Sequence, residues 1–122
     1  MAISYSMTVD GQTLHVRAQG YDEDLDDVLH YGAAVIEAAV AHGVRHVLCN
    51  EIDLEYRLST MDIYASAEYI AERAASVARV AIVCSARDAF DAHFWETVAV
   101  NRGLTVRMFA LEDVARAWLA QA

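Results

Sequence analysis

The chain has 122 residues, 57% of them hydrophobic, with nine arginines, no lysine, no proline and a formal net charge of -9. A chain of this length is expected to form a single domain over residues 1–122. We see no leader sequence and no apolar run near the roughly 20 residues of a membrane span. The sequence therefore predicts a soluble, cytoplasmic protein without stable membrane insertion. The negative charge repels phosphate backbones, so binding to nucleic acid is not expected.

The first half of the chain alternates between strand-like and helix-like patterns. Residues 3–9 and 13–19 have strand composition, and Asp10-Gly11 between them favours a tight hairpin turn. Apolar residues recur at three- and four-residue steps over residues 22–42, which predicts an amphipathic helix that ends at Gly43. Residues 44–52 then predict a buried strand.

The second half continues the same alternation. A helical pattern with apolar spacing of four and three residues runs from Ile63 to Val77, and residues 79–84 form a continuous apolar strand. A helix over residues 86–101, a strand over 104–109 and a terminal helix bearing Trp118 complete the order. The sequence therefore predicts an α/β fold in which an N-terminal β-hairpin feeds a mixed, mostly parallel sheet packed with four helices.

Three carboxylates alternate along the end of the predicted strand 44–52 and just beyond it. Glu51, Asp53 and Glu55 are spaced by two, which points all three to one side at the carboxyl end of a parallel strand. Sheets of this class usually hold ligands at that end, so the three acids are a candidate for acid–base chemistry or cation binding. The simpler interpretation is a strand end whose acids face water, and that is the expected outcome.

Two serines lie at the start of predicted helices. Ser59 and Ser85 each stand three residues before an acid, a spacing that predicts a cap in which the hydroxyl accepts a backbone N–H bond. The same place favours an added phosphate, because the free N–H groups and the helix dipole attract negative charge. Ser59 and the adjacent Thr60 are therefore also candidates for phosphorylation.

Other reactive residue types form no recognised motif. Cys49 and Cys84 lie in apolar runs, where a thiol behaves as a small hydrophobe. The five histidines do not have metal-ligand spacing, no serine or cysteine stands in a nucleophile motif, and no glycine-rich phosphate loop is present. No metal, no cofactor and no catalytic residue is expected, and the sequence favours a protein that is not an enzyme.

The order of elements and three C-terminal segments resemble the STAS superfamily, in particular its SpoIIAA-like branch. The segments are Arg79–Val83, Gly103–Phe109 and Glu112–Leu119, which ends in a tryptophan-leucine pair. The resemblance implies a STAS fold and a regulatory or protein-interaction role. Anti-sigma factor antagonists of this superfamily carry a phosphorylatable serine at the start of the helix after the middle strand, which maps most nearly onto Ser59.

Two functions remain open. The first is an interaction domain that presents one helical face and the loop around Ser59 to a protein partner or to a second copy of itself in a homodimer. The second is a carrier or sensor of a small apolar ligand or lipid with transient membrane contact. Its candidate pocket lies between the sheet and the helices that bear Tyr64, Tyr69, Phe94 and Trp95. A carrier is expected to enclose an apolar cavity of roughly 300 Å³ or more, and an interaction domain to show a filled core and an apolar outer patch.

Overall fold

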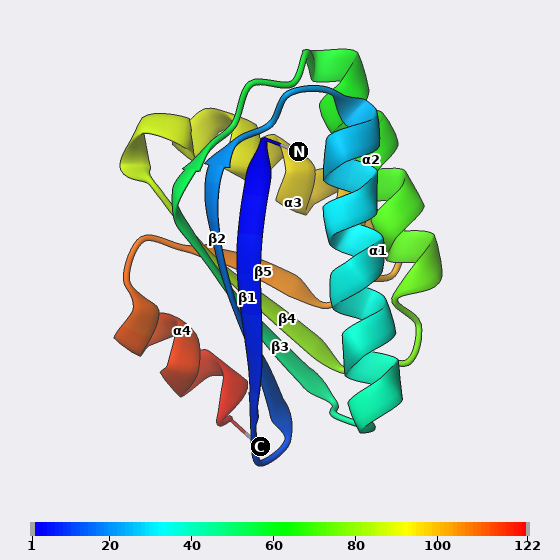
Figure 1. Ribbon diagram of the computed structural model, residues 1–122, viewed down its shortest axis with the longest axis vertical. Helices are drawn as coiled ribbons and strands as arrows, with labels where there is room; N and C mark the ends of the chain where they lie inside the picture. The colour runs from blue at the N-terminus through cyan, green and yellow to red at the C-terminus, as the bar shows by residue number, and fades with distance from the viewer. Residues whose placement is uncertain (1, 122) are drawn as a thin grey trace.

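The five strands of the sheet stand side by side in the order in which they occur in the chain. The computed structural model describes residues 2–121 and is shown in Figure 1. The first two strands are antiparallel, and each later strand is parallel to the one before it. The strands are β1 (Ile3–Asp10), β2 (Thr13–Tyr21), β3 (His46–Glu55), β4 (Arg79–Cys84) and β5 (Val106–Phe109). The predicted hairpin and mostly parallel sheet are confirmed.

Helices cover both faces of this sheet unequally (Figure 1). Three helices pack on one face, and α4 lies alone on the other, against the middle of β3 and β4. The helices are α1 (Leu25–His42), α2 (Thr60–Arg73), α3 (Ala89–Asn101) and α4 (Glu112–Leu119). The predicted count of four helices is confirmed, with a 3-10 turn at Ala86–Asp88 placed before α3.

Local chemistry sets the limits of α1. Asp24 caps its N-terminus by accepting a hydrogen bond of 2.9 Å from the backbone N–H of Asp27. Gly43 ends it in the left-handed conformation with φ 63°, and its N–H bonds to the last carbonyls. The helix begins at Leu25 rather than at Asp22, because the Asp22 N–H bonds to the Glu55 carbonyl at 3.0 Å and so extends the β2–β3 pairing. Asp22 therefore lies beside the end of β3 rather than in the first turn of α1.

The core consists of two apolar layers separated by the sheet. The larger layer joins the sheet to α1, α2 and α3, and the smaller one joins it to α4. Leu48, Ala81 and Val83 point to α4, where Ala115 and Leu119 meet them. β4 is thus buried on both faces, which explains its continuous apolar sequence, and β3 is buried on both faces over Val47, Leu48 and Cys49.

Candidate functional site

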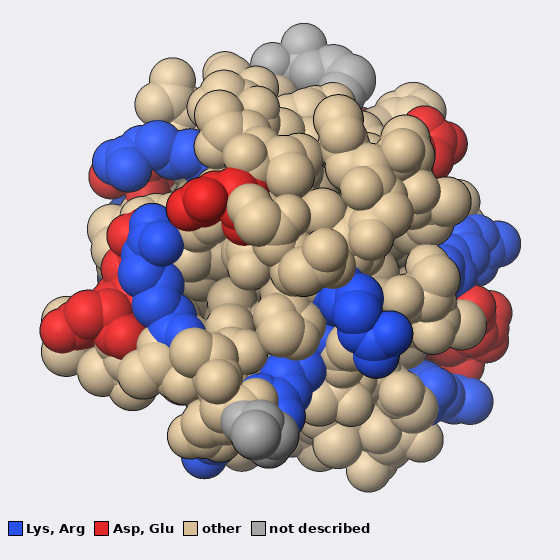
Figure 2. Space-filling view, turned by 90° about the horizontal axis from the view of Figure 1, so that it is seen from below, with Lys and Arg blue, Asp and Glu red and all other residues tan. Residues whose placement is uncertain are grey.

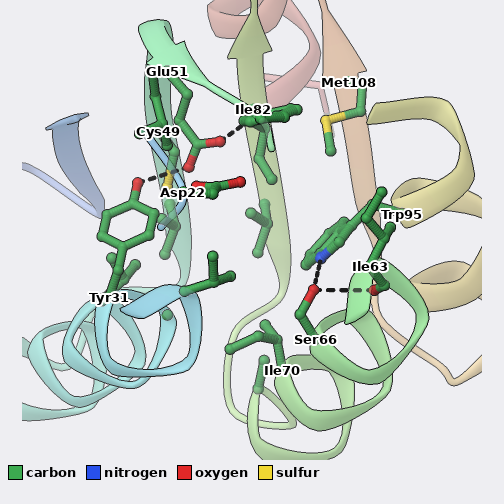
Figure 3. Close-up of a pocket in the computed structure, with 18 of the residues that line it drawn as sticks. Asp22, Tyr31, Cys49, Glu51, Ile63, Ser66, Ile70, Ile82, Trp95 and Met108 are labelled. Atoms are coloured by element: carbon green, nitrogen blue, oxygen red, sulfur yellow. Dashed lines mark hydrogen bonds between the residues drawn. The ribbon is translucent and has the colours of Figure 1, made fainter. Parts of the chain in front are cut away.

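An apolar cavity of about 120 Å³ lies between the sheet and the three helices on its larger layer (Figure 3). Apolar side chains from both strands and helices form most of its wall. They include Val35, Val47, Ile63, Ile70, Ile82 and Met108. The volume is smaller than the roughly 300 Å³ expected of a lipid carrier and comparable to cavities of about 150 Å³ that hold benzene.

Glu51 lies at one end of this cavity, where two tyrosines hold it. The Tyr31 hydroxyl donates to Oε2 at 2.7 Å and the Tyr56 hydroxyl donates to Oε1 at 2.5 Å, while the residue is only 7% exposed. Burial raises the pKa of Glu51, and the two hydroxyl donors oppose that rise because they stabilise the carboxylate. Each oxygen of this buried group therefore has one donor.

Asp22 lies beside Glu51 and also lines the cavity (Figure 3). It is 7% exposed, and burial raises its pKa to about 7, with the charge of Glu51 adding to the effect. Asp27 and Asp88 contribute further repulsion, and the backbone N–H of Arg57 lowers the pKa in part. Asp22 therefore changes its charge near neutral pH inside an apolar environment.

Two more buried acids stand close to this pair. Asp27 is 5% exposed, and neither carboxylate oxygen has a hydrogen-bond partner within residues 2–121. Asp88 is buried as well but accepts from the Tyr56 backbone N–H at 3.3 Å and from the Arg87 guanidinium at 2.9 Å. The acids gather because Asp22, Glu51 and Asp88 stand at or just beyond the carboxyl ends of neighbouring strands, the usual ligand edge of such a sheet.

The arginines are concentrated elsewhere. Arg45, Arg79 and Arg107 stand at the starts of β3, β4 and β5, at the end of the molecule opposite the buried acids. Figure 2 views that end from below and shows several groups of basic side chains there. The net charge of -9 is therefore unevenly distributed over the molecule.

A β-bulge overturns the prediction that Glu51, Asp53 and Glu55 share one side of the strand. Arg17 of β2 is opposite Asn50, but Gln19 is opposite Asp53, so β3 contains one extra residue at this point. The alternation breaks there. Glu51 is buried in the cavity, while Asp53 is exposed and pairs with Arg17 at 3.5 Å.

Glu55, the third acid of that set, is half-buried outside the cavity and contacts two arginines. It forms an ion pair with Arg57 and lies 3.9 Å from the Arg87 guanidinium. The interpretation as solvated acids therefore describes Asp53 and, in part, Glu55, and is wrong for Glu51. The three residues do not form one site.

The four aromatic residues predicted to line a pocket occupy different places. Trp95 lines the cavity, and its indole N–H donates to Ser66 Oγ at 3.0 Å. Tyr64 is exposed and accepts a hydrogen bond from Arg102, while Tyr69 lies under the Arg73 guanidinium on the outer surface. The prediction is wrong for these two because the inward face of α2 carries Ile63, Ser66, Ala67 and Ile70 instead. Phe94 packs against the core without lining the cavity.

The two serine caps differ from each other. Ser59 caps α2 as predicted, since its Oγ accepts the Asp62 backbone N–H at 3.3 Å, and both Ser59 and Thr60 are exposed. Ser85 bonds instead to the Arg87 N–H at 3.2 Å, because the 3-10 turn separates it from the start of α3. Exposure leaves Ser59 accessible to a modifying enzyme.

Both cysteines are buried free thiols, as predicted. Burial raises the pKa of Cys84 to about 11 and raises the pKa of Cys49 further, and the charge of Glu51 adds to both effects. A thiol with a raised pKa stays protonated at neutral pH and is a poor nucleophile. Cys49 and Cys84 are therefore packing residues beside the carboxylates.

Replacing the buried Ser66 with alanine is expected to lower the free energy of unfolding by about 1–3 kcal/mol, because the partly buried Trp95 N–H loses its acceptor. Denaturant titration followed by tryptophan fluorescence measures the change. Thr97→Ala is the matched control, since this exposed hydroxyl bonds only along its own helix, and its effect is expected within about 0.5 kcal/mol. Equal effects of the two substitutions would contradict the stabilising role of the hydrogen bond between Trp95 and Ser66.

The antiparallel hairpin, the otherwise parallel sheet and the four helices define an α/β fold. No family model matches the sequence, and no curated protein matches it. Among residues 2–121, no helix has the length and apolar character needed to cross a membrane.

Three solved structures share this fold. An anti-sigma factor antagonist from Mycobacterium paratuberculosis has a TM-score of 0.65 and 12% identity, over 98% of this chain and 95% of that one. A DUF3478 protein with a SpoIIAA-like fold from Shewanella loihica has a TM-score of 0.59 and 18% identity, over 98% and 94%. The anti-sigma factor antagonist SpoIIAA in its unphosphorylated form has a TM-score of 0.55 and 14% identity, over 98% and 100%. These structures confirm the predicted fold.

Proposed function

We propose that the chain is a non-catalytic STAS-like regulatory domain that binds a protein partner at the carboxyl edge of its sheet. The observation that carries this proposal is the exposure of two large apolar side chains at that edge. Met61, in the first turn of α2, is 82% exposed, and Phe90, in the first turn of α3, is 86% exposed. Ile52 and Leu111 add exposed apolar surface at the same edge of the sheet. Apolar surface of this kind favours a protein contact.

The similar structures support this proposal. Two of them are described as anti-sigma factor antagonists, which act by binding another protein. The partner class we propose for this chain is therefore an anti-sigma factor or a regulator of that kind. A second copy of the chain is the alternative partner, and sedimentation velocity over a range of protein concentrations distinguishes a homodimer from a monomer.

Substituting Met61 and Phe90 together by aspartate is expected to weaken partner binding by at least about tenfold, because both apolar contacts are lost and charge is added. Binding to each anti-sigma factor of the source organism is measured by biolayer interferometry. Val40 and Val100 are exposed apolar residues on α1 and α3 away from this edge, so Val40→Asp with Val100→Asp is the matched control. The proposal fails if no such factor binds the wild type, or if the control weakens binding equally.

Ser59 is the residue we propose as the regulatory site of this surface. Its hydroxyl is exposed, it caps α2, and it lies two residues before Met61. A phosphate there is favoured by the α2 N-terminus but adds charge of about -2 beside the apolar contact. We therefore expect phosphorylation to weaken partner binding rather than to unfold the domain.

Incubation with a cognate kinase and ATP is expected to place one phosphate on Ser59, or on the adjacent Thr60, as read by tandem mass spectrometry. Ser59→Ala and Thr60→Ala identify the acceptor, and Ser85→Ala controls for other helix-cap serines. The phosphorylated protein is expected to bind its partner at least about tenfold more weakly. Modification confined to other residues would contradict this role.

The carrier alternative is narrowed by the dimensions of the cavity. A volume of about 120 Å³ is well below the space that a lipid chain needs. Only a small molecule fits it, and the side chains at its polar end restrict the chemistry of that molecule.

A further inference from the structure

The cavity and the carboxyl groups at its end have the character of a ligand site rather than of a packing defect. We infer that they bind a small organic cation, with an ammonium group held by Asp22 and Glu51 and an apolar body of about six non-hydrogen atoms in the cavity. This inference concerns the interior of the domain. It is independent of the partner surface proposed around Met61 and Phe90.

The shape and lining of the cavity select the body of the ligand. Most of the wall away from Asp22 and Glu51 is formed by aliphatic side chains together with Trp95 and Met108 (Figure 3), and Ser66 and Asp91 also line the cavity. The Ser66 hydroxyl in this wall is already occupied, because it donates to the Ile63 carbonyl and accepts from Trp95. An apolar body is therefore favoured, and a polar one would leave its own groups without partners.

The opposite end selects a cation. Asp22 lines the cavity as a residue that is 7% exposed, and among the described residues one hydrogen bond lowers the pKa of its carboxyl, from the backbone of Arg57. Within residues 2–121, no arginine or histidine forms an ion pair with Asp22 or Glu51. The nearby Arg57 pairs with Glu55 and lies over the Tyr21 ring, so it is directed outward.

The residues around Asp22 and Glu51 also favour binding of a positive charge. Asp27, from α1, is 5% exposed and both of its carboxylate oxygens lack partners within the described residues. Asp88, which follows β4, adds a fourth buried acid, and its bond to Arg87 neutralises only that one. Tyr31 and Tyr56 already donate to Glu51 and cannot neutralise it. An ammonium group supplies the charge that these residues lack.

A metal ion fits this site less well than an ammonium group does. Residues 2–121 contain no group of three histidine, cysteine, aspartate or glutamate side chains arranged to hold one. An ammonium needs only hydrogen-bond acceptors at one end of an apolar body. An ammonium group beside Asp22 also favours the ionised form of its carboxyl, whose pKa burial and the charge of Glu51 raise to about 7, so binding is expected to tighten as the pH rises through 7.

Cyclopentylamine and its neutral counterpart cyclopentanol provide the test, because they differ in charge and share one apolar body. Titration into the ¹⁵N-labelled protein at about pH 8 is expected to shift the amide signals of Asp22, Gly32 and Ser66. The amine is expected to bind at least about tenfold more tightly than the alcohol, and about tenfold more tightly at pH 8 than at pH 5. Equal binding of both compounds, or shifts confined to surface acids such as Asp53, would overturn the inference.

Two variants place the ligand within the site. Asp22→Asn removes the ionisable carboxyl and is expected to weaken amine binding at least about tenfold without weakening alcohol binding. Ile70→Phe fills the cavity and is expected to abolish binding of both compounds. Asp53→Asn is the matched control, since this acid is on β3 like Glu51 but is exposed, and it is expected to leave binding unchanged. Circular dichroism confirms that each variant is folded; a folded Asp22→Asn protein that binds the amine as wild type does would refute the site.

Discussion

The Asp22→Asn protein is expected to be more stable than the wild type at pH 8, by about 2–4 kcal/mol in the free energy of unfolding. The wild-type carboxyl is 7% exposed and must ionise beside Glu51, whereas an asparagine amide carries no charge to desolvate. Most substitutions of buried polar residues destabilise a protein. A gain here would show that the native residue is retained at a cost in stability.

The pH dependence of this gain follows from the raised pKa. The Asp22 carboxyl has a pKa of about 7 in the folded protein and 3.8 as its ordinary value, so between these values the folded chain keeps a proton that the unfolded chain releases. Raising the pH therefore favours unfolding across this window. The stability contributed by protonated Asp22 is fully present below about pH 4 and is lost as the pH rises through 7. The difference between variant and wild type should grow over the same range.

Urea denaturation at several pH values from 4 to 8.5 measures this effect. Asp26→Asn is the matched control, because Asp26 is an exposed acid four residues further along the chain, in the first turn of α1. It is expected to lower the stability slightly, by less than about 1 kcal/mol, through the lost interaction with the helix dipole. An Asp22→Asn gain that does not vary with pH would contradict the proposed ionisation.

Replacing Tyr31 with phenylalanine is expected to lower the free energy of unfolding by about 2–3 kcal/mol at pH 8. The hydroxyl donates to Glu51 at 2.7 Å inside the core, and its loss leaves one carboxylate oxygen without a donor. Hydrogen bonds to charged groups contribute more than those between neutral groups. The same substitution made in a Glu51→Gln protein is therefore expected to cost less, because the amide carries no charge.

A double-mutant cycle isolates this coupling. The four proteins are the wild type, Tyr31→Phe, Glu51→Gln and the double variant, each unfolded in urea at pH 8. Tyr5→Phe is the control, since Tyr5 packs its ring 5.3 Å from that of Tyr31 but is exposed. A coupling energy near zero would show that the hydrogen bond between Tyr31 and Glu51 does not stabilise the protein, and that Tyr31 acts through packing alone.

The fold could be predicted from the sequence because its signals are local. The alternation of apolar rhythm between strands and helices does not depend on distant residues, and neither does the glycine that ends α1 or the serine that caps α2. The outward position of Tyr64 and Tyr69 could also be predicted from the sequence, because Ile63 and Ile70 already define the inward face of the same helix.

The carboxylate site could not be predicted because long-range pairing creates it. Nothing in the sequence near Glu51 marks the extra residue of β3, which appears only as a shift of register against β2. Asp22 belongs to an acidic run that is typical of a helix start, yet a backbone bond to Glu55 pulls it over the sheet. Tyr31 was the available signal, as a hydroxyl on the inward stripe of the first predicted helix has to find a buried partner.

The order of the strands has a consequence for how the chain is made. Since every strand adjoins the one synthesised just before it, the nascent chain can lengthen its sheet by adding each emerging segment to a free edge that is already in place. Among the described strands, none inserts between two earlier ones, so the topology favours stepwise assembly during translation.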